Sequence, residues 1–110
     1  MTTKPDESSA DQLLELGISL CRRARWREAI EPLQRAVSLE PSKVAAHYQL
    51  GDALNSTDRL PEALEAYEAA VKLQPDHWRA LKGIGVVLDR MGRPAEATAA
   101  YQRAREAQKR

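Results

Sequence analysis

The sequence predicts an all-α fold, a solenoid of three helix-turn-helix hairpins made from six antiparallel helices. Helix-favouring residues, above all alanine, leucine, glutamate and arginine, dominate the composition. The five glycines and six prolines are few, and most stand where a helix would start or stop. The strongest observation is that the sequence repeats at a constant interval of 34 residues, which is typical of stacked helical arrays. The recurring columns include Gly17, Gly51, Gly85, Ala29, Ala63, Ala97, Ala36, Ala70 and Ala104.

The middle copy shows how each unit forms two helices. Apolar side chains from Val44 onwards follow the spacing of one helix face until the polar stretch "NSTDR" interrupts them. Pro61 then falls at a helix start, where its missing N–H costs nothing. Pro75 ends the unit, and Asp76 is expected to cap the following helix. By register, the predicted helices span residues 10–23, 27–39, 43–56, 60–73, 77–91 and 94–108.

Two parts of the chain depart from the repeat. Pro32 falls inside the second predicted helix, where it should cause a slight kink and not a break. In the last helix, three columns turn polar or small, which predicts a soluble outer face that caps the array. The residues there are Thr98, Arg105 and Ala107, where the earlier copies have Ile30 and Leu64, Val37 and Val71, and Leu39 and Leu73.

These columns resemble the tetratricopeptide repeat (TPR) family, whose unit has the same length. The resemblance covers residues 10–110 and implies a right-handed α-solenoid with repeats at 10–43, 44–77 and 78–110. Residues 1–9 are then expected to form a flexible tail. The resemblance also implies a non-catalytic scaffold that binds a protein or extended peptide in a concave groove, which the first helix of each repeat lines.

By register, each first helix is expected to present four side chains to this groove. The predicted groove residues are Leu14, Ile18, Cys21, Arg22, Tyr48, Gln49, Asp52, Asn55, Arg79, Lys82, Val86 and Asp89. Leu14 and Ile18 are one helical turn apart and form an apolar strip. Leu13, Leu16 and Leu20 already supply the inward face of that helix, so the core does not explain the strip. Either the N-terminal tail covers it or a partner binds there.

Charge is unevenly spread, although the formal net charge is only +1. Repeat two has two Lys/Arg against six Asp/Glu, whereas repeat three has eight against three. Such asymmetry favours an asymmetric partner. We therefore expect an apolar residue of the partner over Leu14 and Ile18, and an acidic segment near Arg79 and Lys82.

One TPR subclass grips the carboxylate of chaperone tails with a clamp of Lys, Asn and Arg side chains. The matching positions here are Leu14, Ile18, Gln49, Arg79 and Gly83. Only Arg79 keeps the charge and only Gln49 keeps the amide, so the resemblance implies that such tails are not the partner.

The sequence predicts no catalytic residue, metal or cofactor. His47 occupies a slot that leucine fills in the other copies, so we interpret it as a partly buried packing residue. His77 stands at a helix start and is interpreted as a turn residue. The "GIG" that ends at Gly85 lies within a helix and favours close helix packing over phosphate binding. Cys21 is interpreted as a small packing residue, although its arginine neighbours would lower the pKa of a thiol.

Two other functions were weighed. The basic stretch "CRRARWRE" combines arginines with Trp26, as single-stranded RNA sites do. However, Trp26 replaces Leu60 in the same slot and is predicted to plug the hairpin, and a global basic excess is missing, so the sequence disfavours nucleic acid. Self-association through the solenoid ends or the groove is the alternative to peptide binding, with a weak homo-oligomer in place of a monomer.

The remaining composition bounds the compartment. A single cysteine leaves the fold independent of an oxidising environment. The polar N-terminus lacks the basic start and apolar core of a signal peptide, and no apolar run is long enough to span a bilayer. We therefore expect a cytoplasmic protein that does not enter the membrane.

Overall fold

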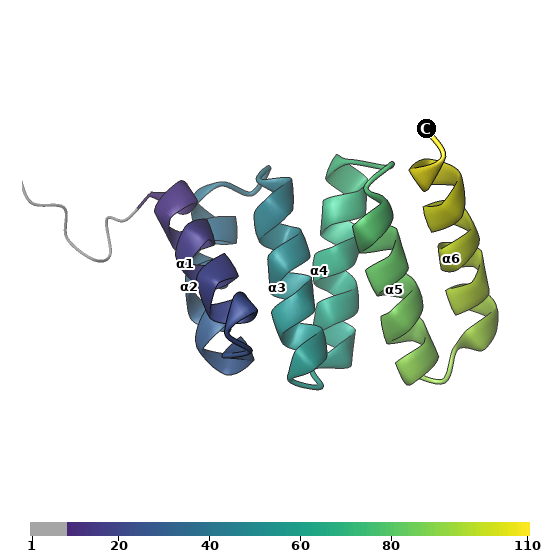
Figure 1. The fold of residues 1–110 in the computed structure, drawn as a ribbon, viewed down its shortest axis with the longest axis horizontal. Coiled ribbons are helices and arrows are strands. Elements are labelled where there is room, and N and C mark those ends of the chain that lie inside the picture. Colours follow the sequence, from purple (N-terminus) through teal and green to yellow (C-terminus); the bar gives the residue numbers. More distant parts are fainter. Residues whose placement is uncertain (1–8) are drawn as a thin grey trace, which may run out of the picture.

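The computed structural model describes residues 9–110 and contains six α-helices and no strand within that range (Figure 1). The helices are α1 (Ala10–Arg22), α2 (Trp26–Leu39), α3 (Val44–Ser56), α4 (Leu60–Leu73), α5 (Trp78–Arg90) and α6 (Pro94–Gln108). Every predicted helix is present, and each boundary agrees with its prediction to within one residue. Residues 1–8, which make up most of the predicted flexible tail, lie outside the described residues.

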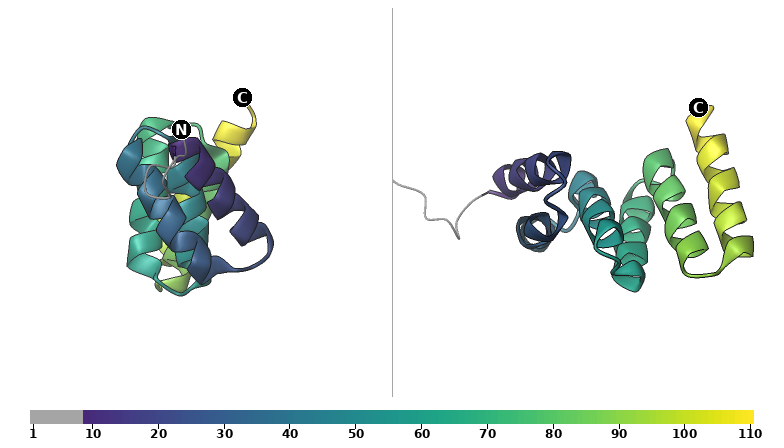
Figure 2. Two further views of the ribbon diagram at one scale, coloured as in Figure 1. Left: turned by 90° about the vertical axis from the view of Figure 1, so that its left-hand side faces the viewer. Right: turned by 60° about the horizontal axis from the view of Figure 1, so that its bottom comes forward.

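The helices stack as hairpins in one curved row (Figures 1 and 2). α1 packs on α2, α3 on α4 and α5 on α6, while α2–α3 and α4–α5 contacts join successive hairpins. α1 also contacts α3, and α3 contacts α5, whereas α2, α4 and α6 have no Cα atoms within 8 Å of one another. Because alternate helices contact one another on one side of the row only, α1, α3 and α5 form its inner, concave side. The predicted all-α solenoid of helical hairpins is confirmed.

Glycines allow the two helices of each hairpin to approach closely. A Cβ atom at Gly17 would lie 2.4 Å from the Leu33 side chain, which no packed structure tolerates. The same relation recurs between Gly51 and the Tyr67 ring, and between Gly85 and the ring of Tyr101. The repeated glycine column therefore faces a repeated large side chain, and the pair fixes the spacing of each hairpin.

The three hairpin turns also repeat. Ala24, Asp58 and Gly92 occupy the same position in successive copies, and all three have positive φ, at 59°, 62° and 76°. An arginine follows each of them and pairs with a glutamate three residues later. These exposed pairs are Arg25–Glu28, Arg59–Glu62 and Arg93–Glu96. The sequence analysis did not identify this column, although the residues recur at the same interval.

Two helix caps differ from the prediction. Ser9, which was assigned to the tail, caps α1: its Oγ accepts from the Gln12 backbone N–H, and its own N–H donates to Gln12 Oε1. His77, and not Asp76, caps α5, because its Nδ1 accepts from the backbone N–H of Ala80 at 3.1 Å.

Three leucines show how neighbouring repeats decide burial. Leu16 was assigned to the core but is 50% exposed, whereas its counterparts Leu50 and Ile84 are buried. Only the latter two have a preceding hairpin against which to pack. Leu39 and Leu73 were expected to lie under the next repeat, yet they are 53% and 44% exposed. That column therefore gives no information about the end of the array.

Pro32 is buried within α2, and the helix continues through it from Trp26 to Leu39. The prediction that this proline does not break the helix is confirmed.

Candidate functional site

The twelve predicted groove residues all lie on the three helices of the concave side. Their exposure falls into three groups. Four are exposed: Arg22, Arg79, Lys82 and Asp89. Seven are half-buried: Leu14, Ile18, Tyr48, Gln49, Asp52, Asn55 and Val86. Cys21 alone is buried, so eleven of the twelve side chains have surface on which a partner can act.

Cys21 belongs to the core and not to the concave surface. Only 7% of the residue is exposed. Burial, helped by the nearby charge of Asp52, raises the pKa of its thiol to about 11. The arginine neighbours in the sequence do not lower that pKa, because burial in the apolar core has the larger effect. Cys21 is therefore a packing residue, as the sequence analysis interpreted it, and offers a partner little surface.

The apolar strip is partly a product of packing. Leu14 and Ile18 are both half-buried, and Leu14 packs against the buried residues of the first two hairpins. The core therefore explains part of the strip, contrary to the prediction. The tail that was weighed as its cover lies outside the described residues. What remains on the surface is a modest apolar patch at the α1 end of the concave side.

Asp52 holds the centre of the concave side. Its Oδ1 accepts a hydrogen bond of 2.5 Å from the Tyr67 hydroxyl, which reaches it from α4. Burial raises the pKa of Asp52, and hydrogen bonds from Tyr67 and Tyr48 partly offset that rise. The Tyr48 ring lies 6.0 Å from the Tyr67 ring and 5.0 Å from the His77 ring. A half-buried carboxyl group surrounded by aromatic rings therefore forms the middle of the surface.

Gly83 makes the contact with Tyr67 possible from the next repeat. A Cβ atom at Gly83 would lie 2.7 Å from Tyr67 Cζ, the ring atom that carries the hydroxyl. The ring is only 1% exposed, because it lies between α3 and α5. The sequence analysis correctly favoured close helix packing for the "GIG" stretch, but it did not identify which ring the glycine meets.

The other end of the concave side carries free positive charge. Arg79 and Lys82 are exposed and lie one helical turn apart on α5. The Arg79 guanidinium lies 4.8 Å from the centre of the Trp78 ring, a cation–π geometry. Among residues 9–110, neither cation forms an ion pair with a carboxylate. The two charges are therefore available to an anionic partner.

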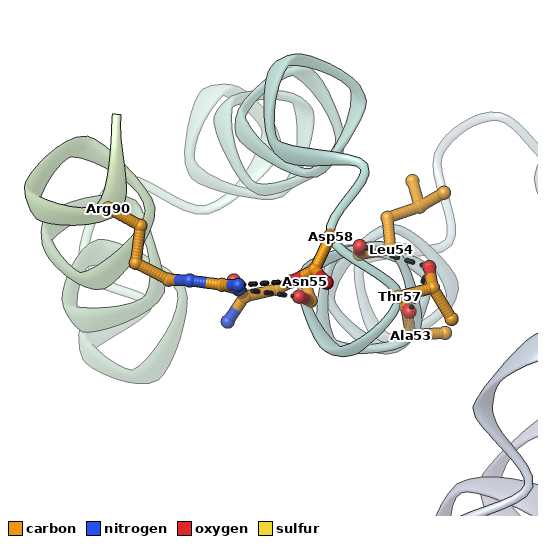
Figure 3. Close-up of polar contacts among 6 residues, drawn as sticks. All are labelled: Ala53, Leu54, Asn55, Thr57, Asp58 and Arg90. Atoms are coloured by element: carbon orange, nitrogen blue, oxygen red, sulfur yellow. Dashed lines mark hydrogen bonds and ion pairs between the residues drawn. The ribbon is translucent and has the colours of Figure 1, made fainter. Parts of the chain in front are cut away.

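Asn55 and Asp89 are already engaged within the chain. Arg90 reaches back to the preceding hairpin, where its Nη1 donates to the backbone oxygen and to Oδ1 of Asn55, each at 2.6 Å (Figure 3). Its Nη2 pairs with Asp58. Asp89 accepts from the Tyr101 hydroxyl at 3.1 Å. The sequence analysis missed the Arg90 bridge, because repeat two has serine at the matching position and offers no column to follow.

The residues weighed for other chemistry take structural places. His47 is half-buried, as predicted, with Nε2 2.8 Å from the Pro41 carbonyl oxygen. Trp26 begins α2, is half-buried and packs against the core, as expected of a side chain that plugs the hairpin. Residues 9–110 hold no group of three or more His, Cys, Asp or Glu side chains placed to bind a metal ion. None of the described helices has the length and apolar character needed to cross a bilayer.

A row of stacked helical hairpins with a concave inner side defines an α-solenoid of the helical-repeat class. Sequence profiles described as tetratricopeptide repeat match residues 14–69 and residues 43–110. The chain therefore belongs to the tetratricopeptide repeat family, which confirms the resemblance inferred from the repeated columns. A comparison with curated proteins finds no match.

Solved structures of the same fold include MamA and YrrB. A MamA crystal structure is 31% identical, with a TM-score of 0.86, over 92% of this chain and 59% of the MamA chain. YrrB, described as a TPR protein with an unusual peptide-binding site, is 28% identical with a TM-score of 0.88, over 92% of this chain and 52% of its own. This chain therefore spans little more than half the length of these neighbours.

Proposed function

We propose that the chain is a non-catalytic scaffold that binds an extended segment of another protein along the concave side. The proposal rests on how apolar surface side chains and cations without an ion pair are arranged along α1, α3 and α5. An apolar patch at Leu14 and Ile18 lies at one end, and the unpaired cations Arg79 and Lys82 lie at the other. YrrB, a neighbour with a peptide-binding site, supports the same class of function.

The proposed segment carries an apolar residue over Leu14 and Ile18 and an acidic stretch over Arg79 and Lys82. Neither cation has to give up an ion pair with any of residues 9–110 in order to bind a carboxylate. Three repeats offer a short surface, so affinity in the micromolar range is expected, about −8 kcal/mol. The chaperone-tail clamp stays excluded from the proposal, because Leu14, Ile18 and Gly83 supply no donor where that clamp needs one.

Charge reversal tests this placement. The double variant Arg79→Glu, Lys82→Glu should lose at least about tenfold in affinity for the natural partner, since each repelled carboxylate costs about 1 kcal/mol or more. The matched control is Arg27→Glu, Lys72→Glu on α2 and α4, two exposed cations outside the inner row. Full affinity in the first variant, or an equal loss in both, would refute the proposed face. Isothermal titration of the partner recovered from source lysate supplies the measurement.

Self-association through the ends is a second candidate function. Leu16 is half exposed at one end, and a cavity of about 340 Å³ opens at the other. Trp78, Lys82, Tyr101, Ala104, Arg105 and Gln108 line this cavity. The equivalent surface of repeat two is covered by α5, so an end-to-end contact between copies would continue the stack. Light scattering distinguishes the candidates, because a constant monomer mass across the micromolar range excludes this one.

We also place the protein in the cytoplasm. The one cysteine is buried and free, so the fold requires no oxidising compartment. Fractionation of source cells with an antibody to the chain tests this, and recovery in a membrane or extracellular fraction would contradict it.

A further inference from the structure

Asp52 differs from the other acidic residues of the hairpin row in its surroundings. It is half-buried on the inner face, and no ion pair joins it to a Lys or Arg of residues 9–110. Tyr67 and Tyr48 supply hydrogen bonds, whereas an ionised carboxylate has about four acceptor positions, so part of its capacity is unused. Carboxylates removed from bulk water without a cation or enough donors are costly to keep charged. The site is therefore incomplete as it stands.

Residues from four helices gather around this carboxylate. Tyr67 comes from α4 and passes beside Gly83 of α5 to reach it. Cys21 of α1 is close enough that the Asp52 charge raises its thiol pKa. Tyr48 lies on α3 itself, one turn before Asp52, and its ring faces the Tyr67 ring. The carboxylate therefore stands where all three hairpins meet, in the path of any segment that lies along the concave side.

The chemistry around Asp52 suits a positively charged group. An amine or guanidinium fills the empty acceptor positions with charge-assisted hydrogen bonds. The half-buried Tyr48 ring beside Asp52 adds an aromatic surface that attracts cations. Repeat two also has six acidic against two basic residues, which raises the local concentration of cations.

We propose that Asp52 binds a lysine or arginine side chain of the segment held on the concave side. The inference rests on the proposed peptide-binding function and sharpens it: the segment carries a basic residue at its middle and an acidic stretch toward Arg79 and Lys82. The basic residue of the partner then faces Asp52 on α3, and its acidic stretch faces Arg79 and Lys82 on α5.

A purely structural role for Asp52 has to be separated from this one. Asp89 accepts from Tyr101 in repeat three in a similar way, so a carboxylate can serve only to hold a tyrosine. Asp52→Asn separates the two roles, because the carboxamide oxygen still accepts from Tyr67 while the charge is lost. Glu65→Gln on α4 is the matched control, since it removes the same charge from an exposed carboxylate outside the inner row.

The experiment uses pools of N-acetylated decapeptide amides in which one position is fixed and the others are mixed. Binding to the full chain is measured by fluorescence polarisation. For the unaltered protein, pools fixed as Lys or Arg at one position should bind about tenfold more tightly than pools fixed as Gln there. Asp52→Asn should reduce that preference to less than about twofold, and Glu65→Gln should leave it intact. Thermal melting confirms that both variants are folded.

Other results would overturn the inference in distinguishable ways. If peptides bind without a basic preference, or if the preference survives Asp52→Asn, the cation site is wrong and the proposed function stands. If the preference falls equally in both variants, it reflects general charge and not this site. If no pool binds, both the inference and the peptide-binding function fall together.

Discussion

Tyr67 and Tyr101 occupy the same position in successive repeats, yet their side chains differ in burial. Tyr67 is 1% exposed, whereas Tyr101 is half-buried. Each ring lies against a glycine of its own hairpin, but Tyr67 also lies against Gly83 of the next one. Their hydroxyls donate to Asp52 and Asp89, respectively. The comparison teaches that in a stacked array the same residue becomes core or surface according to whether a further hairpin covers it.

Removal of the two rings should give the largest difference between the repeats. Tyr67→Ala should lower the free energy of unfolding by about 3–5 kcal/mol, because it empties a fully enclosed site. Tyr101→Ala should cost about 1–2 kcal/mol, since its ring is already partly in water. Urea denaturation followed by circular dichroism measures both. Equal losses would show that the covering hairpin adds nothing to the burial.

Added methyl groups at the glycines test the same comparison from the other side. Gly83→Ala should cost about 1–3 kcal/mol, because the enclosed Tyr67 ring has nowhere to move. Gly85→Ala should cost less, since the Tyr101 ring can turn toward its open side. Both variants gain about 0.5–1 kcal/mol from better helix propensity, so that term cancels between them. A larger loss at Gly85 in thermal unfolding would contradict the comparison.

Removal of the hydroxyls should have a smaller effect and should also change the pH dependence. Tyr67→Phe leaves the half-buried Asp52 without its donor and should cost about 1–2 kcal/mol, against less than about 0.5 kcal/mol for Tyr101→Phe. Burial raises the pKa of Tyr67 well above its usual range. Above about pH 10 the unfolded chain therefore loses a proton that the folded chain keeps, so stability falls as pH rises.

Tyr67→Phe should accordingly flatten the alkaline decline in stability, which urea titrations between pH 9 and pH 11 will measure. Tyr101→Phe serves as the control. Burial and the hydrogen bond to Asp89 also raise the pKa of Tyr101, but its ring is only half-buried, so this variant should flatten the decline less. An alkaline decline that is unchanged in Tyr67→Phe would mean that other groups carry it.

The hairpin turns should give the smallest effects and provide the counter-case. Ala24 and Gly92 share a left-handed backbone whatever lies beside them. Ala24→Gly should stabilise the fold by about 0.5–1 kcal/mol, because alanine is strained at positive φ. Gly92→Ala should cost about 1 kcal/mol for the same reason, since a Cβ there meets no atom within 4 Å. A loss of stability in Ala24→Gly would show that helix-end entropy outweighs the strain.

The repeated columns predict the helices well, because turn and core residues return at one interval in all three copies. They do not predict Leu16, Leu39 or Leu73, whose exposure depends on which neighbour is present and how closely it approaches. A repeated column predicts only the features that all copies share, whereas the burial of a side chain also depends on the hairpins next to its own.

The candidate site divides in the same way. Its three helices, and eleven of its twelve side chains on the inner surface, follow from register. The Tyr67–Asp52 bond and the bridge from Arg90 to Asn55 do not, because the acceptors Asp52 and Asn55 are replaced by other residue types in the other copies. The burial of Cys21 depends on the same local packing. Chemistry particular to one repeat is therefore the part of the site that a repeated pattern cannot supply.

The one-sided contact between helices gives the row a mechanical character. α1, α3 and α5 meet along the inner edge, while α2, α4 and α6 stand free of one another. Such an array can bend: a small rotation of one hairpin against the next at the inner edge changes the distance between the outer helices. A bound segment that shortens the inner edge would therefore spread α2, α4 and α6 and increase the curvature of the array.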